Sequence, residues 1–203
     1  MNRFFQEEIT VAIIAGGKST RFGSPKALAY LGDKRLIDYA LETANNLSSN
    51  VVLSVARDHP FQNILNVSFV VDVLHNIGPA GGIYSVLKYS PSPWIAVLPC
   101  DMPLLSATIY QYLWQSRRGI KPVVAQSHSG LEPLVSLWNT SIIPSFESMI
   151  RQGIFSLHKL IETFDGIIVD LPRIMEAYQP HYFLNVNRKE DLNRIKEILA
   201  SQE

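Results

Sequence analysis

Short apolar runs alternate with amphipathic stretches along the first half of the chain. Thr10–Ala15 opens a series of brief segments rich in β-branched residues, which is typical of strands buried on both faces of a parallel sheet. The others in this half are Val51–Val55, Phe69–Val71 and Trp94–Leu98. Between them, apolar side chains at helical spacing predict helices at Leu36–Asn45, Gly82–Tyr89 and Thr108–Arg117. Strands that alternate with helices indicate βαβ units.

The second half is less regular. It predicts strands at Val123–Ala125, Leu134–Leu137 and Ile167–Val169, and helices at Ile142–Arg151 and Phe155–Thr163. A final helix is indicated by Asn187 and, three residues later, Glu190, which together have the form of a capping box. We therefore expect residues 1–203 to form one α/β domain, a three-layer sandwich around a mostly parallel, mixed central sheet.

Composition narrows the choice of partners and compartment. Charged residues make up 18% of the 203 positions, and 18 Lys and Arg balance 18 Asp and Glu. Because long nucleic acids usually bind surfaces with a surplus of Lys and Arg, we expect no nucleic-acid partner. The single cysteine, Cys100, excludes an intrachain disulfide and favours a reducing compartment. The longest apolar runs, Val11–Ala15 and Trp94–Leu98, are too short to span a bilayer, so we expect a cytoplasmic protein with no membrane association.

The segment after the first predicted strand combines glycines with cations. It runs through Gly16 and Gly17 and then presents Lys18, Arg21 and Lys26. Glycines let backbone N–H groups approach phosphate oxygens, and the cations offset phosphate charge. In an open α/β sheet, ligands bind beyond the carboxyl ends of the strands, where this segment should lie. It therefore predicts a site for a phosphorylated ligand, and the alternative is a surface turn with solvated cations.

A carboxylate follows another predicted strand. Asp101 follows three positions after the predicted strand Trp94–Leu98 and lies between two prolines, so it is well placed to hold Mg²⁺, which binds hard oxygen ligands. The alternative is that Asp101 caps the helix near Ala107 or shapes a turn. The neighbouring Cys100 is better explained as a small buried side chain than as a nucleophile, because the sequence ties no histidine to it.

A second glycine-rich segment, Gly78–Ile83, precedes a predicted helix and follows Asp72, which ends the third strand. It supplies a helix N-terminus with unobstructed backbone, which attracts negative charge. A plain helix-entry turn is the competing explanation.

Together these segments resemble a known superfamily, the nucleotidyltransferases with a Rossmann-like core. The similarity to its signature loop lies in Ala15-Gly16-Gly17, Ser19, Arg21-Phe22-Gly23 and Lys26. Within the superfamily, the chain resembles the molybdenum cofactor guanylyltransferases. That narrower resemblance rests on Pro99–Pro103, Gly78–Gly82, Glu132-Pro133-Leu134 and Phe183–Asn187.

The resemblance implies an enzyme that transfers GMP from GTP to a molybdopterin-type acceptor and releases pyrophosphate. It implies Mg²⁺ as the cofactor, held by Asp101, with Arg21, Lys26 and Asp101 as catalytic residues. The GTP-binding residues it implies are Ile14, Ala15, Gly16, Gly17, Lys26, Asp72, Gly78, Pro79, Gly82 and Asp101. Asn185 and Asn187 are the implied acceptor contacts. The nucleotide-binding half would be about residues 10–105, and the acceptor-binding half about residues 106–203.

Three other functions stay open. A pterin cytidylyltransferase would differ in its base, and Met102, where those relatives more often have glutamine, favours GTP. The others are a sugar-phosphate nucleotidyltransferase and, from another class, a nucleotide-binding regulatory protein. The resemblance also allows transient contact with molybdenum-insertion or recipient proteins.

Overall fold

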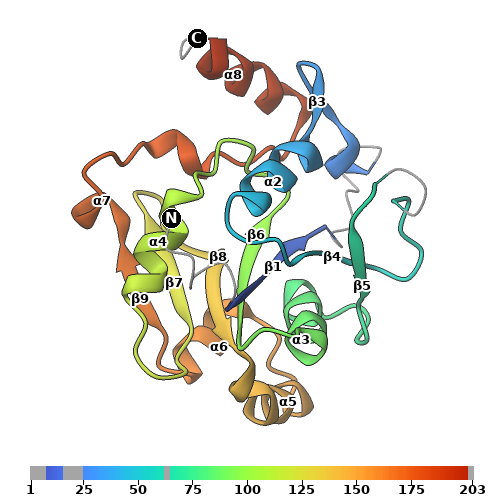
Figure 1. The fold of residues 1–203 in the computed structure, drawn as a ribbon, viewed down its shortest axis with the longest axis vertical. Helices are drawn as coiled ribbons and strands as arrows, with labels where there is room; N and C mark the ends of the chain where they lie inside the picture. The colour runs from blue at the N-terminus through green and yellow to red at the C-terminus, as the bar shows by residue number, and fades with distance from the viewer. Residues whose placement is uncertain (1–7, 16–24, 62–64, 201–203) are drawn as a thin grey trace.

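A seven-stranded sheet forms the centre of the computed structural model, which describes residues 8–15, 25–61 and 65–200 (Figure 1). The strand order is β5-β4-β1-β6-β8-β7-β9. All pairs are parallel except those of β8 with β6 and with β7. The expected α/β fold with a mostly parallel, mixed sheet is therefore confirmed. The strands are β1 (Ile9–Ile14), β4 (Val51–Val55), β5 (Ser68–Val71), β6 (Trp94–Pro99), β7 (Val123–Ser127), β8 (Gly130–Asn139) and β9 (Ile167–Asp170).

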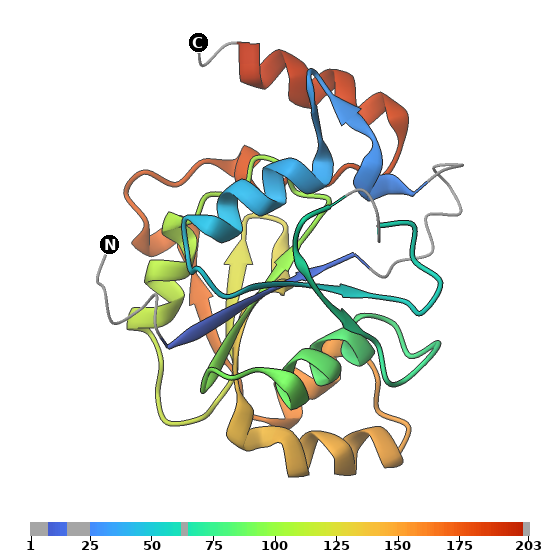
Figure 2. The same ribbon diagram turned by 45° about the vertical axis from the view of Figure 1, so that its right-hand side comes forward.

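Helices cover both faces of this sheet (Figure 2). On one face lie α2 (Leu36–Asn45) and α4 (Thr108–Gln115), and on the other lie α3 (Pro79–Tyr89), α5 (Ile143–Arg151) and α6 (Leu157–Thr163). The remaining helices are α7 (Leu171–Ile174), α8 (Lys189–Ala200) and 3-10 turns at Lys26–Leu28, Thr140–Ile142 and Pro180–Phe183.

The two faces have separate apolar cores, and the central strands contribute to both. In β1, Val11 and Ile13 belong to the core under α2 and α4, whereas Ala12 belongs to the core under α3, α5 and α6. All three side chains are fully buried. Successive side chains of a strand point to opposite faces, so a strand covered on both faces must be apolar throughout. This explains why the sequences of the central strands are almost entirely apolar.

Helix α3 begins three residues earlier than the apolar pattern predicts. Pro79 occupies the first turn, and Gly78 precedes it with φ +68°, a conformation that favours glycine. Gly81, expected before the helix, and Gly82, expected as its first residue, therefore both lie within the helix. The helix starts with Gly78 as its cap and Pro79 as its first residue, even though Gly81 and Gly82 have weak helix propensity.

A short hairpin after the first 3-10 turn was not predicted. It pairs β2 (Tyr30–Leu31) with β3 (Lys34–Arg35), and two residues a strand are too few for a periodic signal. Figure 1 shows α8 beside this hairpin, at the top of the molecule. A third small core, which includes Leu31 and Ile195, joins them. The last helix thus packs on an element from the first half of the chain.

The capping carboxylate at the start of α8 lies one residue later in the chain than predicted. The helix begins at Lys189, and the carboxylate that reaches back is Asp191, not Glu190. It accepts hydrogen bonds from the backbone N–H groups of Asn187 and Arg188, at 2.7 and 2.8 Å. These bonds lower the pKa of Asp191. Asn187 therefore lies one position before the helix cap.

In the part of the chain that the structure describes, every helix is too short or too polar to cross a bilayer.

Candidate nucleotide site

The parallel strands β1, β4, β5 and β6 end at one edge of the sheet, where ligands bind in open α/β folds. Ala15 follows β1, Asp72 follows β5 and Asp101 follows β6. Of the predicted site residues, Gly16, Gly17 and Arg21 lie outside the described residues, so their assignments stay predictions. The others can be placed.

Lys26 and Asp101 form an ion pair across 75 positions of sequence. Lys26 Nζ lies 2.5 Å from Asp101 Oδ2, and both side chains are about four-fifths buried, with 19% and 21% of their surface exposed. Lys26 opens the 3-10 turn that follows the glycine-rich segment. The structure thus brings two of the three predicted catalytic residues together.

The alternative role of Asp101 as a helix cap is not realised. Helix α4 begins at Thr108, and no side chain caps it at Ala107. The main chain of Asp101 has a different task, because its carbonyl accepts a hydrogen bond from Val186 N–H at 2.8 Å. Val186 lies between Asn185 and Asn187, so both predicted acceptor contacts flank a residue bonded to Asp101.

Asp72 is held at the end of β5 by two hydrogen bonds. Its N–H donates to the Val55 carbonyl at 2.9 Å, and its Oδ1 accepts from Ser54 Oγ at 2.8 Å. Burial raises the pKa of Asp72, while the Ser54 hydrogen bond and the nearby His75 oppose this rise. A half-buried carboxylate is thus available at this edge to accept hydrogen bonds from a ligand.

Gly82 brings helix α3 against these strand ends. A Cβ atom added there would come too close to Ser54 Oγ and would lie 3.5 Å from both Asp72 Oδ1 and Ile14 Cδ1. Ile14, Asp72 and Gly82, three predicted GTP-binding residues, therefore meet at one place. Ser54 was not predicted, although a fully buried polar residue inside the apolar run Val51–Val55 could have indicated it.

The N-terminus of α3 lies at the same edge. Gly78 caps it, Pro79 follows, and Gly81 N–H donates to the Gly78 carbonyl at 3.0 Å. A helix of 11 residues carries partial positive charge at its N-terminus, where anions bind favourably. A helix N-terminus therefore lies in the predicted segment, although the helix begins at Pro79 and not at Gly82, and its charge suits a phosphorylated ligand.

Cys100 and Met102, the neighbours of Asp101, both point into the core. Their residues are 8% and 6% exposed. Burial and the charge of Asp101 raise the pKa of Cys100 to about 12, so the thiol stays protonated at neutral pH. Cys100 is the small buried side chain that the sequence predicts. Met102 acts through packing, so any effect it has on base choice is indirect.

A metal ion at this edge would rely on Asp101. Among the described residues, no three His, Cys, Asp or Glu side chains gather as a ligand set. The Asp101 carboxylate is partly exposed and already faces a cation, Lys26 Nζ. A hard oxygen donor in this setting fits Mg²⁺, which commonly uses one or two carboxylates together with substrate phosphates.

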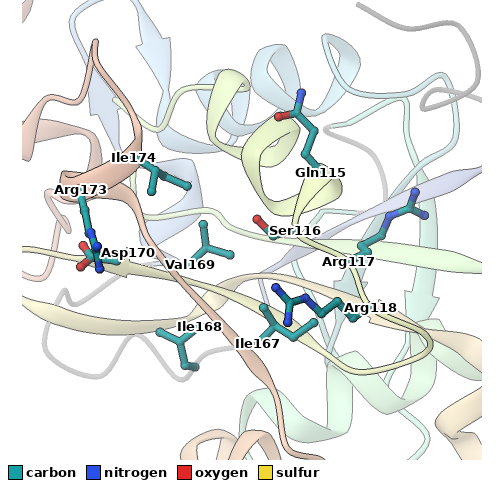
Figure 3. A pocket seen from close by; sticks show the side chains of 10 residues that line it. All are labelled: Gln115, Ser116, Arg117, Arg118, Ile167, Ile168, Val169, Asp170, Arg173 and Ile174. Atoms are coloured by element: carbon teal, nitrogen blue, oxygen red, sulfur yellow. The ribbon is translucent and has the colours of Figure 1, made fainter.

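A surface hollow lies elsewhere, along the outer edge strand β9 (Figure 3). Residues of α4, β9 and α7 and the loop after α4 line it, among them Arg118 and Arg173. None of the predicted site residues lines this hollow. The strand-end edge with Asp72 and Asp101 is therefore the candidate site.

Comparison with known proteins shows the family of this chain. A sequence model of the MobA-like NTP transferase domain matches residues 11–166, which include most of β1 and all of α3, together with Asp72 and Asp101. The chain belongs to the MobA-like NTP transferase family. It is therefore a nucleotidyltransferase by family.

Individual relatives match nearly the whole chain. A probable molybdenum cofactor guanylyltransferase of Pyrococcus furiosus is 31% identical over 91% of this chain and 95% of its own length. One of Carboxydothermus hydrogenoformans is 29% identical over 97% and 100%. The crystal structure of molybdopterin-guanine dinucleotide biosynthesis protein A from Archaeoglobus fulgidus superposes with a TM-score of 0.81, at 22% identity over 95% of this chain and 99% of that one. This last similarity shows that the fold is shared.

Proposed function

We propose that the protein is a molybdenum cofactor guanylyltransferase, which transfers GMP from GTP to molybdopterin and releases pyrophosphate. One observation carries the proposal. The carboxylate of Asp101 is bonded to Lys26, at the exit of the glycine-rich segment, while its carbonyl is bonded to Val186, between two asparagines. The segments that we assign to the nucleotide and to the acceptor thus meet at one residue, which supports a transfer between two phosphorylated substrates. The names of relatives that match nearly the whole chain support the choice of substrates.

The chemistry needs positioning and charge neutralisation more than a strong base. An oxygen of the acceptor phosphate attacks the α-phosphorus of GTP in line, a new P–O bond forms, and the bond to the bridging oxygen of pyrophosphate breaks. The attacking phosphate is already ionised at neutral pH, so no side chain has to remove a proton. Pyrophosphate leaves with the bonding electrons, and the site must stabilise the charge that develops on it.

We assign that stabilisation to cations around Asp101. Lys26, held at the sheet edge, would lie beside a bound phosphate, and Arg21 would assist it. The N-terminus of α3 adds partial positive charge from Gly78 and Pro79. Asp101 would hold Mg²⁺, which supplies further charge neutralisation and fixes the line of attack. Backbone N–H groups of Ala15, Gly16 and Gly17 would cradle the phosphates.

The remaining assignments follow the two sides of the site. Ile14, Asp72 and Gly82 form a compact group that we assign to the nucleoside part of GTP. Asn185 and Asn187 would contact the acceptor. We place the nucleotide half at about residues 10–105 and the acceptor half at about 106–203, in one domain. A cytoplasmic location and transient contact with molybdenum-insertion or recipient proteins belong to the same proposal.

The test is a direct assay of the transfer. Purified protein is incubated with Mg²⁺, molybdenum-loaded molybdopterin and either GTP or CTP, and pyrophosphate release is measured with the nucleotide joined to the pterin. We expect product with GTP and little with CTP. A preference for CTP would show a cytidylyltransferase, and turnover only with a sugar phosphate would show the third enzyme class. Tight GTP binding with no product from any acceptor would favour a regulatory protein. Omitting Mg²⁺ should abolish the reaction.

A further inference from the structure

A bulge in β8 lies near the site edge of the sheet. Val124 of β7 pairs with Ser136, but the next residue, Ala125, pairs with Glu132. Three residues of β8, Pro133–Val135, therefore have no counterpart in this pairing. Bulges bend a strand and redirect its side chains, and they are frequent beside active sites. The bulge begins directly after Glu132.

Glu132 is a partly buried carboxylate held by one hydrogen bond. Ser127 Oγ, at the end of β7, donates to its Oε1 at 2.7 Å. Burial raises the pKa of Glu132, the Ser127 hydrogen bond opposes this, and the charge of Asp101 raises it further. The pairing of β8 with β6 gives the geometric reason, because Ser136 lies opposite Val97 in this antiparallel pair. The residues of β8 before Ser136 therefore continue toward the end of β6, which Asp101 follows. Asp101 thus has a second acid nearby, contributed by the second half of the chain.

Two carboxylates on one partly buried edge repel each other unless a cation lies nearby. Asp101 has such a cation, because Lys26 forms an ion pair with it. Among the described residues, Ser127 is the sole hydrogen-bond donor to Glu132, and it is neutral. A carboxylate fixed on one oxygen by a hydroxyl group can accept hydrogen bonds from water on the other. This is the arrangement by which residues outside the direct ligand set orient the water molecules of a hydrated ion.

We infer that Glu132 is a positioning residue for the Mg²⁺ of the proposed reaction, and that its carboxylate accepts hydrogen bonds from water molecules bound to the ion at Asp101. The inference rests on the proposed function, because it takes Mg²⁺ at Asp101 as given. Mg²⁺ keeps several of its waters in proteins, so a carboxylate beyond direct contact still acts on it. Glu132 would thereby fix the ion from the acceptor side.

The variant Glu132→Gln tests this, since its amide oxygen can still accept from Ser127 Oγ while the charge is removed. Two quantities are measured for each protein. The first is the dissociation constant of Mn²⁺ from the protein–GTP complex, followed by water-proton relaxation without acceptor and so without turnover. The second is the Mg²⁺ concentration that half-saturates GMP transfer. We expect both to rise about 10-fold in Glu132→Gln.

Two further variants distinguish a specific role of the Glu132 carboxylate from a general effect of removing a charge. Ser127→Ala removes the hydrogen bond that fixes Glu132, and it should shift both quantities in the same direction by a smaller factor. The matched control is Glu162→Gln, on α6, where an exposed carboxylate pairs with Lys159. This control should leave both quantities at the wild-type values.

The outcomes distinguish the inference from the function on which it rests. Wild-type protein without Mg²⁺-dependent GMP transfer would overturn the proposed function. If the wild type transfers GMP and Glu132→Gln binds Mn²⁺ as tightly as the wild type, the inference is overturned and the function stands. A rise in the KM for the acceptor with unchanged Mn²⁺ binding would overturn it too, and would make Glu132 an acceptor contact.

Discussion

The variant Gly82→Ala probes the contact by which helix α3 meets the strand ends. The added methyl group would be too close to Ser54 Oγ, a fully buried atom that donates to Asp72 Oδ1. The hydroxyl can escape only by rotating, and rotation breaks that hydrogen bond. A hydrogen bond to a charged group contributes about 1.5–3 kcal/mol, whereas replacing glycine by alanine inside a helix gains about 1 kcal/mol. We expect a net loss of about 0.5–2 kcal/mol in the free energy of unfolding.

The same rotation should weaken nucleotide binding. Asp72 would lose the donor that orients it, so the dissociation constant for GTP should rise about 10-fold. The free energy of unfolding is measured by urea denaturation, with the slope checked for two-state behaviour, and GTP affinity by calorimetry.

Combining Gly82→Ala with a second substitution, Ser54→Ala, tests whether the contact with Ser54 Oγ causes the loss of stability. In Ser54→Ala the obstructing hydroxyl is absent, so Gly82→Ala should there become neutral or stabilise by up to about 1 kcal/mol. Gly81→Ala is the matched control, because its methyl group would lie 2.9 Å from the Leu74 carbonyl oxygen, which Ser54→Ala does not move. If Gly82→Ala costs the same in the wild-type background and in the Ser54→Ala background, the contact with Ser54 is not the reason for glycine.

Other consequences concern the carboxylates and the thiol. Asp101→Asn should retain the melting temperature and lower pyrophosphate release by about 100- to 1,000-fold, and near-normal turnover would contradict its role. Asp72→Asn should stabilise the fold by about 0.5–1 kcal/mol in urea at pH 7 while weakening GTP binding. Folding raises the pKa of Asp72, so the ionised carboxylate destabilises the folded state at pH values above that pKa. The stability gained in Asp72→Asn should therefore vanish as the pH falls toward 4, where the carboxylate becomes protonated. A stability gain that persists at low pH would refute this cause. Cys100, with a pKa of about 12, should react with a thiol reagent at pH 8 only at the rate of unfolding, and rapid labelling of native protein would show an accessible thiol.

Most of the central elements could be predicted from local pattern. The bounds of α2 and β4 agree with the predicted bounds, those of β1 are shifted by one residue at both ends, and β6 ends one residue later than predicted. These segments are long enough to show apolar periodicity, and burial on both faces makes the signal strong. The hairpin β2–β3 was not predicted, because strands of two residues are too short to show apolar periodicity. The capping carboxylate of α8 was misassigned because Glu190 and Asp191 are adjacent and equally suited to the task.

The sequence by itself determined the alternation of strands and helices, the glycine-rich segments at strand ends, and the acid after β6, because each depends on neighbouring residues. It also carried the family resemblance. Only the tertiary structure decided which distant groups meet. Lys26 pairs with Asp101, Val186 bonds to Asp101, and Ser54 explains why position 82 is glycine. The physical reason is that these groups lie far apart in the sequence and meet through the strand order of the sheet and the packing of its two cores, which no local pattern encodes.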